Sequence, residues 1–415
     1  MRNNIAMLFD GVALLLAKAT FIGLRLLTLY LCAAFLARSA FGALALAFTT
    51  AEICRYIGDW GTDVWSLRRF SQLEAIPARR QLWLVVRLRI VGSLVAGGLA
   101  WTSIALLAPQ PIVWWHAMIS LTAVTSLWLN LGVNWFQARG SLRRIACLFA
   151  VAGAACALVL IVEHHMQASI TQRLVTLMSF ETVLAACVVI IALLSGAGEV
   201  ASWTRPALRA WFTEATPIAF AALIGLAYGR LDLYFVSRTA SPDVLGDYSL
   251  AQRLVEPILF IAAAMSSTIY ARASAFIQQH GRCSETSGYA WRWVRMVSCM
   301  ATIVSIFIGI VFALVRHYLL PGYSGVVTFM WTALLCTCFR CTNLGLTAFI
   351  QAFGEYRLMF RISLFNAVSI TCAVIGVGTL FGPLGAALGV SLGEALNTGV
   401  QTYKLRRILS AEGQT

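Results

Sequence analysis

Five basic residues lie inside long apolar stretches of this chain, where charge is rare. Lys18 and Arg25 belong to the first stretch, and Arg230, Arg253 and Arg340 belong to later ones. Lys18 and Arg25 are seven residues apart, about two turns of an α-helix, so they share one helix face. Because a charge within a bilayer is unfavourable, such residues usually face a hydrated cavity or a partner of opposite charge. The pattern predicts a cationic site for an anionic cargo inside a membrane.

Four carboxylates in or near the apolar stretches are candidates for binding a coupling proton or cation. They are Glu52, Glu181, Glu256 and Glu394. Glu256 follows Arg253 by three residues, a spacing at which two side chains pair on one helix face. Two interpretations of these acids stay open on the sequence: an ion-coupling group, or a structural partner that neutralises a buried base. The only acidic residue of the first stretch is Asp10, at its inner end. Arg25 must therefore be neutralised by another helix or by a ligand, which favours a functional role for this residue.

An aromatic side chain and an amide form a second candidate site. Trp128 and Asn130 lie two residues apart within one apolar stretch. Tryptophan usually anchors a helix at the membrane surface, but its indole also combines an apolar face with a polar N–H group. We expect Trp128 either to take this anchoring role or to stack on a sugar ring beside Asn130.

The elements that must position these groups are membrane-spanning helices. The chain has 415 residues, is 60% hydrophobic and 12% charged, and has a mean hydropathy of +0.80. Soluble domains carry about 25% charged residues. Apolar segments of the roughly 20 residues needed to span a bilayer lie near residues 11–36, 41–58, 82–108, 112–136, 145–162, 174–196, 211–237, 247–270, 293–315, 323–350, 357–381 and 383–403.

The twelve predicted spans divide into two equal halves. We predict an all-α polytopic membrane protein, in which two six-helix lobes surround a central cationic cavity. The amino-terminal lobe is expected at residues 1–197, a cytoplasmic connection at 198–210 and the carboxy-terminal lobe at 211–415. Gly42 and Gly246 occupy corresponding places in the two halves, each followed by Leu-Ala at the fourth and fifth positions. This correspondence indicates an internal repeat of the kind found in transporters.

Three glycines recur at intervals of four in the last predicted span: Gly385, Gly389 and Gly393. This spacing places them on one helix face and allows a neighbouring backbone to approach closely. We expect this neighbour to be a helix of the same chain, with a dimer interface as the alternative.

The distribution of charge predicts the orientation in the membrane. Most of the 31 lysine and arginine residues fall in or beside alternate connections between the spans. Under the positive-inside rule, this asymmetry places both termini in the cytoplasm. Orientation thus accounts for the net charge of +14, and we expect no nucleic-acid partner.

Motifs for covalent chemistry are absent from the sequence. It has no phosphate-binding glycine loop, no zinc-binding His-Glu pattern, and no Ser or Cys nucleophile with a histidine at a recognisable spacing. The 11 cysteines fall mostly within the spans, where free cysteine behaves as a small apolar residue. We therefore predict a protein that is not an enzyme and that holds no metal or cofactor.

Six passages of the chain form recognisable motifs, at residues 36–47, 59–63, 216–218, 230–232, 246–256 and 382–387. Together they resemble the Wzx-type polysaccharide flippases of the multidrug/oligosaccharidyl-lipid/polysaccharide (MOP) exporter superfamily. The likeness is spread over nearly the whole chain and is closest at 246–256. One residue departs from the pattern, because Trp60 stands where the family usually has leucine.

This resemblance implies a flippase of the bacterial inner membrane that moves an undecaprenyl-pyrophosphate-linked oligosaccharide outward by alternating access. Such repeat units supply surface polysaccharides, namely the O-antigen of lipopolysaccharide, capsule or exopolysaccharide. The implied partners are this lipid-linked substrate, membrane lipids, and the glycan polymerase and glycosyltransferases of the same pathway. We expect the substrate to be bound by Lys18, Arg25, Arg230, Arg253, Arg340, Trp128 and Asn130.

Two other functions stay open on the sequence. A MATE-like drug or metabolite antiporter would share the two-lobe architecture, although five buried basic residues disfavour the cationic compounds that drug exporters commonly handle. A membrane-embedded glycan-modifying enzyme would need a large outer loop or a catalytic histidine within a span, and the sequence indicates neither. The sugar, the repeat length and the choice between proton and sodium coupling are not specified by the residues.

Overall fold

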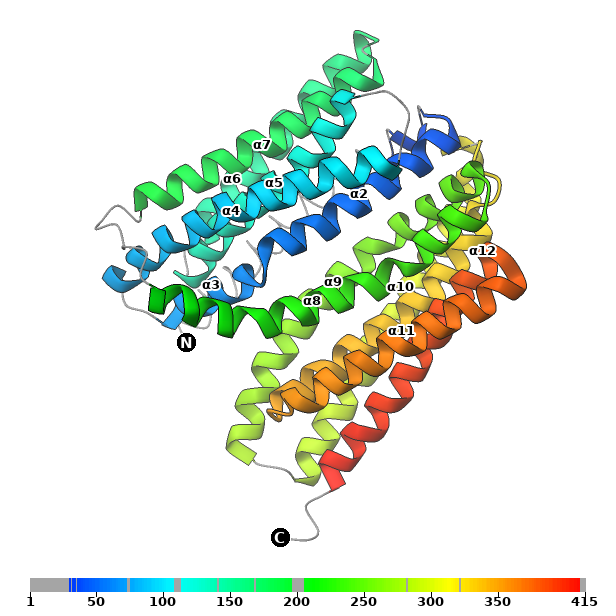
Figure 1. Cartoon of the computed structure of the whole chain (residues 1–415). Helices are drawn as coiled ribbons and strands as arrows, with labels where there is room; N and C mark the ends of the chain where they lie inside the picture. Colours follow the sequence, from blue (N-terminus) through cyan, green and yellow to red (C-terminus); the bar gives the residue numbers. More distant parts are fainter. Residues whose placement is uncertain are drawn as a thin grey trace. The chain divides into compact units, whose positions relative to one another are not determined.

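The computed structural model describes residues 30, 32–34, 36–72, 75–107, 113–139, 142–167, 169–195, 205–280, 283–320 and 322–410. All of its elements within these ranges are α-helices (Figure 1). The predicted span 11–36, with Lys18 and Arg25, lies almost entirely outside the described residues. The helices are α2 (Arg38–Asp59), α3 (Thr62–Gln72), α4 (Ala75–Leu107), α5 (Val113–Ala138), α6 (Leu142–His165), α7 (Ile170–Ser195), α8 (Arg205–Thr239), α9 (Pro242–His280), α10 (Ser284–Leu319), α11 (Val326–Ala352) and α12 (Tyr356–Ser410).

The predicted spans after the first coincide with described helices or with halves of α12. By length and composition, 8 of the described helices are able to cross a membrane. The apolar part of α6 is shorter, at Cys147–Glu163. The prediction of an all-α polytopic membrane protein is confirmed.

The two last predicted spans form a single bent element, α12. Gly382 interrupts its helical conformation with φ 63° and ψ −145°, a backbone region that glycine adopts without steric penalty. Beyond this bend the chain doubles back on itself (Figure 1). A Cβ on Gly389 would lie 2.6 Å from the carbonyl oxygen of Ala373, and one on Gly385 would lie 2.2 Å from that of Val377. The glycine stripe therefore packs within the chain, as predicted.

Replacing Gly389 by Ala is expected to destabilise this hairpin, because the new methyl group would overlap the backbone of the facing half. Overpacking of this kind costs roughly 1–3 kcal/mol. Gly376→Ala is the matched control, since a Cβ there meets nothing within 4 Å. The thermal midpoint of the purified protein, followed by light scattering in detergent, should fall for Gly389→Ala only. Equal midpoints for the two variants would contradict the close backbone contact.

The chain divides into two compact units, which we call lobe 1 (residues 1–35 and 47–223) and lobe 2 (residues 36–46 and 224–415). The division falls inside α8, between residues 223 and 224. The helix itself begins earlier, at Arg205, which lies within the predicted connection 198–210.

The start of α2 belongs to lobe 2 because it packs on α9. A Cβ on Gly42 would lie only 2.8 Å from the amide nitrogen of Gly246. Arg38 approaches the carboxylate of Asp247 at 3.6 Å. The two glycines that the internal repeat relates to each other are thus in direct contact.

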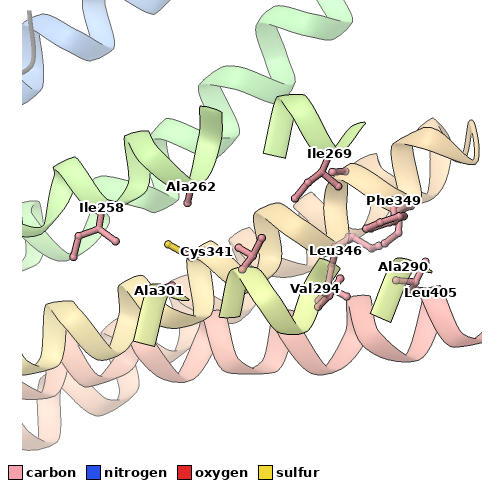
Figure 2. Close-up of a cluster of buried hydrophobic side chains, with 14 of the residues drawn as sticks. Ile258, Ala262, Ile269, Ala290, Val294, Ala301, Cys341, Leu346, Phe349 and Leu405 are labelled. Atoms are coloured by element: carbon pink, nitrogen blue, oxygen red, sulfur yellow. The ribbon is translucent and has the colours of Figure 1, made fainter. Parts of the chain in front are cut away.

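Each lobe has its own apolar core. In lobe 2 the core lies between α9, α10, α11 and the second half of α12, where Ile258, Val294, Phe349 and Leu405 are all buried (Figure 2). In lobe 1 the core is formed by α3, α4, α5, α6, α7 and the start of α8, and it surrounds the buried Trp135. These two cores hold in place the helices that carry the polar residues described below.

Candidate functional site in lobe 2

A cavity of about 560 Å³ lies between α8, α9, α11 and both halves of α12, entirely within lobe 2. Small-molecule sites typically measure roughly 300–1,000 Å³. Two of the predicted basic residues, Arg230 and Arg340, line the cavity, and so do the predicted carboxylates Glu256 and Glu394. The structure thus brings together groups that are far apart in the sequence.

Glu256 is the centre of the first charge cluster. Arg230 on α8 places Nη2 at 2.8 Å from Glu256 Oε1. Arg253, three residues earlier on α9, donates from Nη1 to both carboxylate oxygens at 3.0 and 3.2 Å. The predicted pairing of Arg253 with Glu256 is confirmed, and Arg230 shares the same acid.

Glu394 is the centre of the second cluster and joins α11 to the second half of α12. Arg340 donates from Nε to Glu394 Oε1 at 3.1 Å, and Asn343 donates from Nδ2 to Oε2 at 2.9 Å. The side chain of Glu394 is only 5% exposed, whereas that of Arg340 is 21% exposed. Both residues line the cavity, and Arg340 is the more exposed of the two.

A third acid, Asp232 on α8, completes the charge balance and was not among the predicted site residues. It is buried and accepts hydrogen bonds from the hydroxyl of Tyr248 and, at 3.3 Å, from Gln252 Nε2. Asp232 lines a small pocket together with Arg230 and Arg253. Three arginines and three carboxylates therefore meet in this part of lobe 2.

Carboxamide and hydroxyl groups make up most of the remaining polar lining of the cavity. Several are bonded to each other, as in the donation from Gln401 Nε2 to Asn397 Oδ1 at 3.2 Å and from Thr347 Oγ1 to Gln401 Oε1 at 3.1 Å. The carboxamide residues that line the cavity are Gln252, Asn343, Gln351, Asn366, Asn397 and Gln401. The site offers many hydrogen-bonding groups of both kinds in a setting of balanced charge.

The other predicted site residues that the structure describes lie in lobe 1 and do not line this cavity. Trp128 donates from Nε1 to Ser93 Oγ at 3.0 Å. Asn130 donates from Nδ2 to Asp63 Oδ2 at 2.8 Å. Glu52 and Glu181 are half-buried on α2 and α7. Trp128 and Asn130 thus have partners within lobe 1, and their proposed contact with a sugar stays a prediction.

Lobe 1 contains a buried charge cluster of its own, around Arg89. Arg89 lies near the start of the predicted span 82–108, and its side chain is 1% exposed. Its Nη1 lies 2.6 Å from Asp59 Oδ1, and its Nη2 bonds to Asp63. Asp63 also accepts at its backbone oxygen from Asn134 Nδ2 at 2.9 Å. The cluster ties α2 and α3 to α4 and α5.

Trp60, the residue that departs from the family pattern, lies at the turn before α3. Its backbone adopts φ 43°, and its indole Nε1 donates to Thr216 Oγ1 at 3.1 Å. The tryptophan therefore joins this turn to α8 within lobe 1, a contact that leucine cannot make.

The sequence matches no protein-family model and no curated protein. Its fold is shared with solved membrane transporters. An inward-facing multidrug resistance MATE-family transporter of the MOP superfamily is similar with a TM-score of 0.70 and 15% identity, over 95% of this chain and 96% of the other. The lipid II flippase MurJ in an inward closed conformation is similar with a TM-score of 0.67 and 10% identity, over 98% and 88%. A MATE transporter of Vibrio cholerae gives a TM-score of 0.62 and 13% identity, over 98% and 97%.

These likenesses establish the architecture. The chain has the twelve-helix, two-lobe fold of MATE-like transporters, as the alternation of apolar spans and charged connections predicts. The central cationic cavity between the lobes stays a prediction.

Proposed function

We propose that this chain is a flippase of the MOP superfamily, which moves a lipid-linked oligosaccharide across the inner membrane of a bacterium. The observation that carries the proposal is a polar cavity with three arginines in or beside it, set among membrane helices of a fold that includes a lipid II flippase. Apolar bilayer surroundings offer no reason to retain such a group of polar residues unless they pair or bind a polar cargo. The motifs that resemble Wzx-type flippases support the same substrate class.

In this function Lys18, Arg25, Arg230, Arg253 and Arg340 bind the pyrophosphate and the sugars of the cargo between them, while its polyprenyl tail stays in the bilayer. The cargo is an undecaprenyl-pyrophosphate-linked repeat unit for O-antigen, capsule or exopolysaccharide. Glycosyltransferases of the pathway supply it on the cytoplasmic side, where both termini of the chain lie, and a polymerase consumes it on the other side.

The direct test is translocation in proteoliposomes that contain the purified chain. A labelled polyprenyl-pyrophosphate oligosaccharide on the inner leaflet should become accessible to a membrane-impermeant oxidant about tenfold faster than in protein-free vesicles, a change equivalent to about 1.4 kcal/mol of barrier. Arg25→Ala should reduce this rate, because it removes a cation that no acid of its own span neutralises. Arg357→Ala removes an exposed charge at the start of α12 and is the matched control. Translocation at the rate of protein-free vesicles would reject the flippase.

A MATE-like antiporter is the second candidate, because carboxylates such as Glu256 and Glu394 lie inside the membrane lobe and the similar structures include multidrug transporters. Binding of cationic dyes by the purified protein, without translocation of the lipid-linked glycan, would favour it. A glycan-modifying enzyme is disfavoured because the similar solved structures are transporters and a flippase. Coupling through Glu52, Glu181, Glu256 or Glu394 would be rejected if translocation continued after both the proton and the sodium gradients were collapsed.

A further inference from the structure

We infer that the lobe 2 cavity binds the uncharged sugar part of the cargo and not its pyrophosphate. This inference rests on the proposed flippase function and assigns one part of the substrate to one cavity.

The charges around the cavity leave little attraction for an anion. Glu256 contacts Arg230 and Arg253, and Glu394 contacts Arg340, at distances of 2.8 to 3.1 Å. With the buried Asp232, three carboxylates balance three arginines. A pyrophosphate in the cavity would lie beside Glu256 and Glu394, and repulsion between like charges is strong where water is scarce. The arginines still offer N–H groups to neutral acceptors.

The remaining polar groups match the chemistry of a neutral carbohydrate. Six carboxamides line the cavity, and each carboxamide both donates and accepts hydrogen bonds, as a sugar hydroxyl does. The hydroxyl groups of Thr337, Thr347 and Ser363 extend this lining. Such a surface binds a polyol at several points without any requirement for charge.

Asn366 provides an independent indication that the lining has unused hydrogen-bonding capacity. Its side chain is 1% exposed and hydrogen-bonds with Tyr228, yet its Oδ1 has no hydrogen-bond partner among the described residues. Buried polar atoms are nearly always satisfied, so an exception of this kind indicates a strained or functional position. Asn366 lines the cavity from the first half of α12. After a small shift of its side chain, a hydroxyl group of a bound ligand would donate a hydrogen bond to Oδ1.

Two glycines on α8 leave space in the cavity that side chains would otherwise fill. Gly225 and Gly229 lie one turn apart and both line the cavity. A Cβ built on either one meets nothing within 4 Å, so helix packing within lobe 2 does not require glycine there. Glycine within a helix lowers stability relative to alanine. Their presence is explained if this space is occupied by the cargo.

The test uses the purified full chain in lipid nanodiscs and three probes. The first is a panel of polyprenyl pyrophosphates that carry neutral mono- to tetrasaccharides, the second is the same polyprenyl pyrophosphate without sugar, and the third is the free oligosaccharides. Gly225→Leu fills the cavity from α8, and Gln351→Leu removes one carboxamide without filling it. Gly376→Leu is the control, because this glycine is exposed on α12 and does not line the cavity.

In the native chain, at least one sugar-bearing probe should bind about tenfold more tightly than the bare lipid pyrophosphate, which corresponds to about 1.4 kcal/mol of binding free energy. Gly225→Leu should remove this advantage, Gln351→Leu should reduce it, and both variants should bind the bare lipid as the native chain does. Unchanged affinity of Gly225→Leu for every sugar-bearing probe would overturn the inference. So would an equal loss for bare and sugar-bearing probes in both variants.

Failure of the proposed function gives a different result. If the native chain binds no lipid pyrophosphate but binds a free oligosaccharide, and Gly225→Leu abolishes that binding, the sugar site stands and the flippase function falls. Absence of binding to all three kinds of probe overturns both.

Discussion

Replacing Arg89 by Met is expected to destabilise lobe 1 strongly. The substitution removes Arg89, which is 1% exposed and contacts both Asp59 and Asp63, and leaves only Arg55, at 3.8 Å from Asp63, to face two carboxylates. Removing one partner of a buried ion pair costs about 3–5 kcal/mol. The measurement is the thermal midpoint of the purified protein, followed by the intrinsic fluorescence of its 13 tryptophans. We expect a large decrease, or loss of folded protein from the membrane fraction.

A compensating variant separates lost charge balance from lost packing. When Asp59→Asn accompanies Arg89→Met, no unpaired charge is left, because Arg55 still lies 3.8 Å from Asp63, and replacing a buried ion pair by neutral groups is often tolerated. The double variant should therefore regain most of the lost stability. If the single variant were as stable as the native chain, the cluster would not hold α4 to α2 and α3.

The spans were predictable from the sequence because a membrane requires long apolar helices. The bend at Gly382 was predictable as well, since glycine followed by Pro383 interrupts a helix that is otherwise apolar for more than 40 residues. Contacts between residues close in sequence could also be derived, as the pairing of Arg253 with Glu256 shows.

The partners of the other buried charges could not be derived, because they depend on which faces of distant helices meet. Arg340 and Glu394 are 54 residues apart, and Arg89 and Asp59 are 30 apart. Periodicity places a residue on a helix face but does not choose the neighbouring helix. Arg89 lies near the amino-terminal end of its span, and nothing in its sequence position identifies Asp59 and Asp63 as its partners.

The cavity in lobe 2 illustrates the same limit. Its charged lining residues were singled out individually from their positions in apolar stretches, but the balance of arginines by carboxylates appears only when α8, α9, α11 and α12 are assembled. Asn366 and Gln252 gave no signal, since single amides in membrane helices also serve helix packing. The sequence therefore predicted a site for a charged cargo, whereas the assembled site is close to neutral.

Replacing Arg340 by Met is expected to have the largest effect in lobe 2, on both stability and transport. It leaves Glu394, whose side chain is 5% exposed, without its cation, and the loss of one partner from a buried pair costs about 3–5 kcal/mol. Glu394→Gln should be less harmful, because the Arg340 side chain is 21% exposed and keeps contact with the cavity. The thermal midpoint should thus fall more for Arg340→Met than for Glu394→Gln.

The double variant Arg340→Met with Glu394→Gln distinguishes support of the fold from contact with the cargo. Neutralising both members removes the unpaired charge, so the thermal midpoint should return close to that of the native chain. Translocation should stay low, because the N–H groups that Arg340 presents to the cavity are gone. If the double variant were as unstable as Arg340→Met, the unpaired charge of Glu394 would not be the cause of the lost stability. Translocation at the native rate would show that Arg340 makes no productive contact with the cargo, and would confine this ion pair to holding α11 against α12.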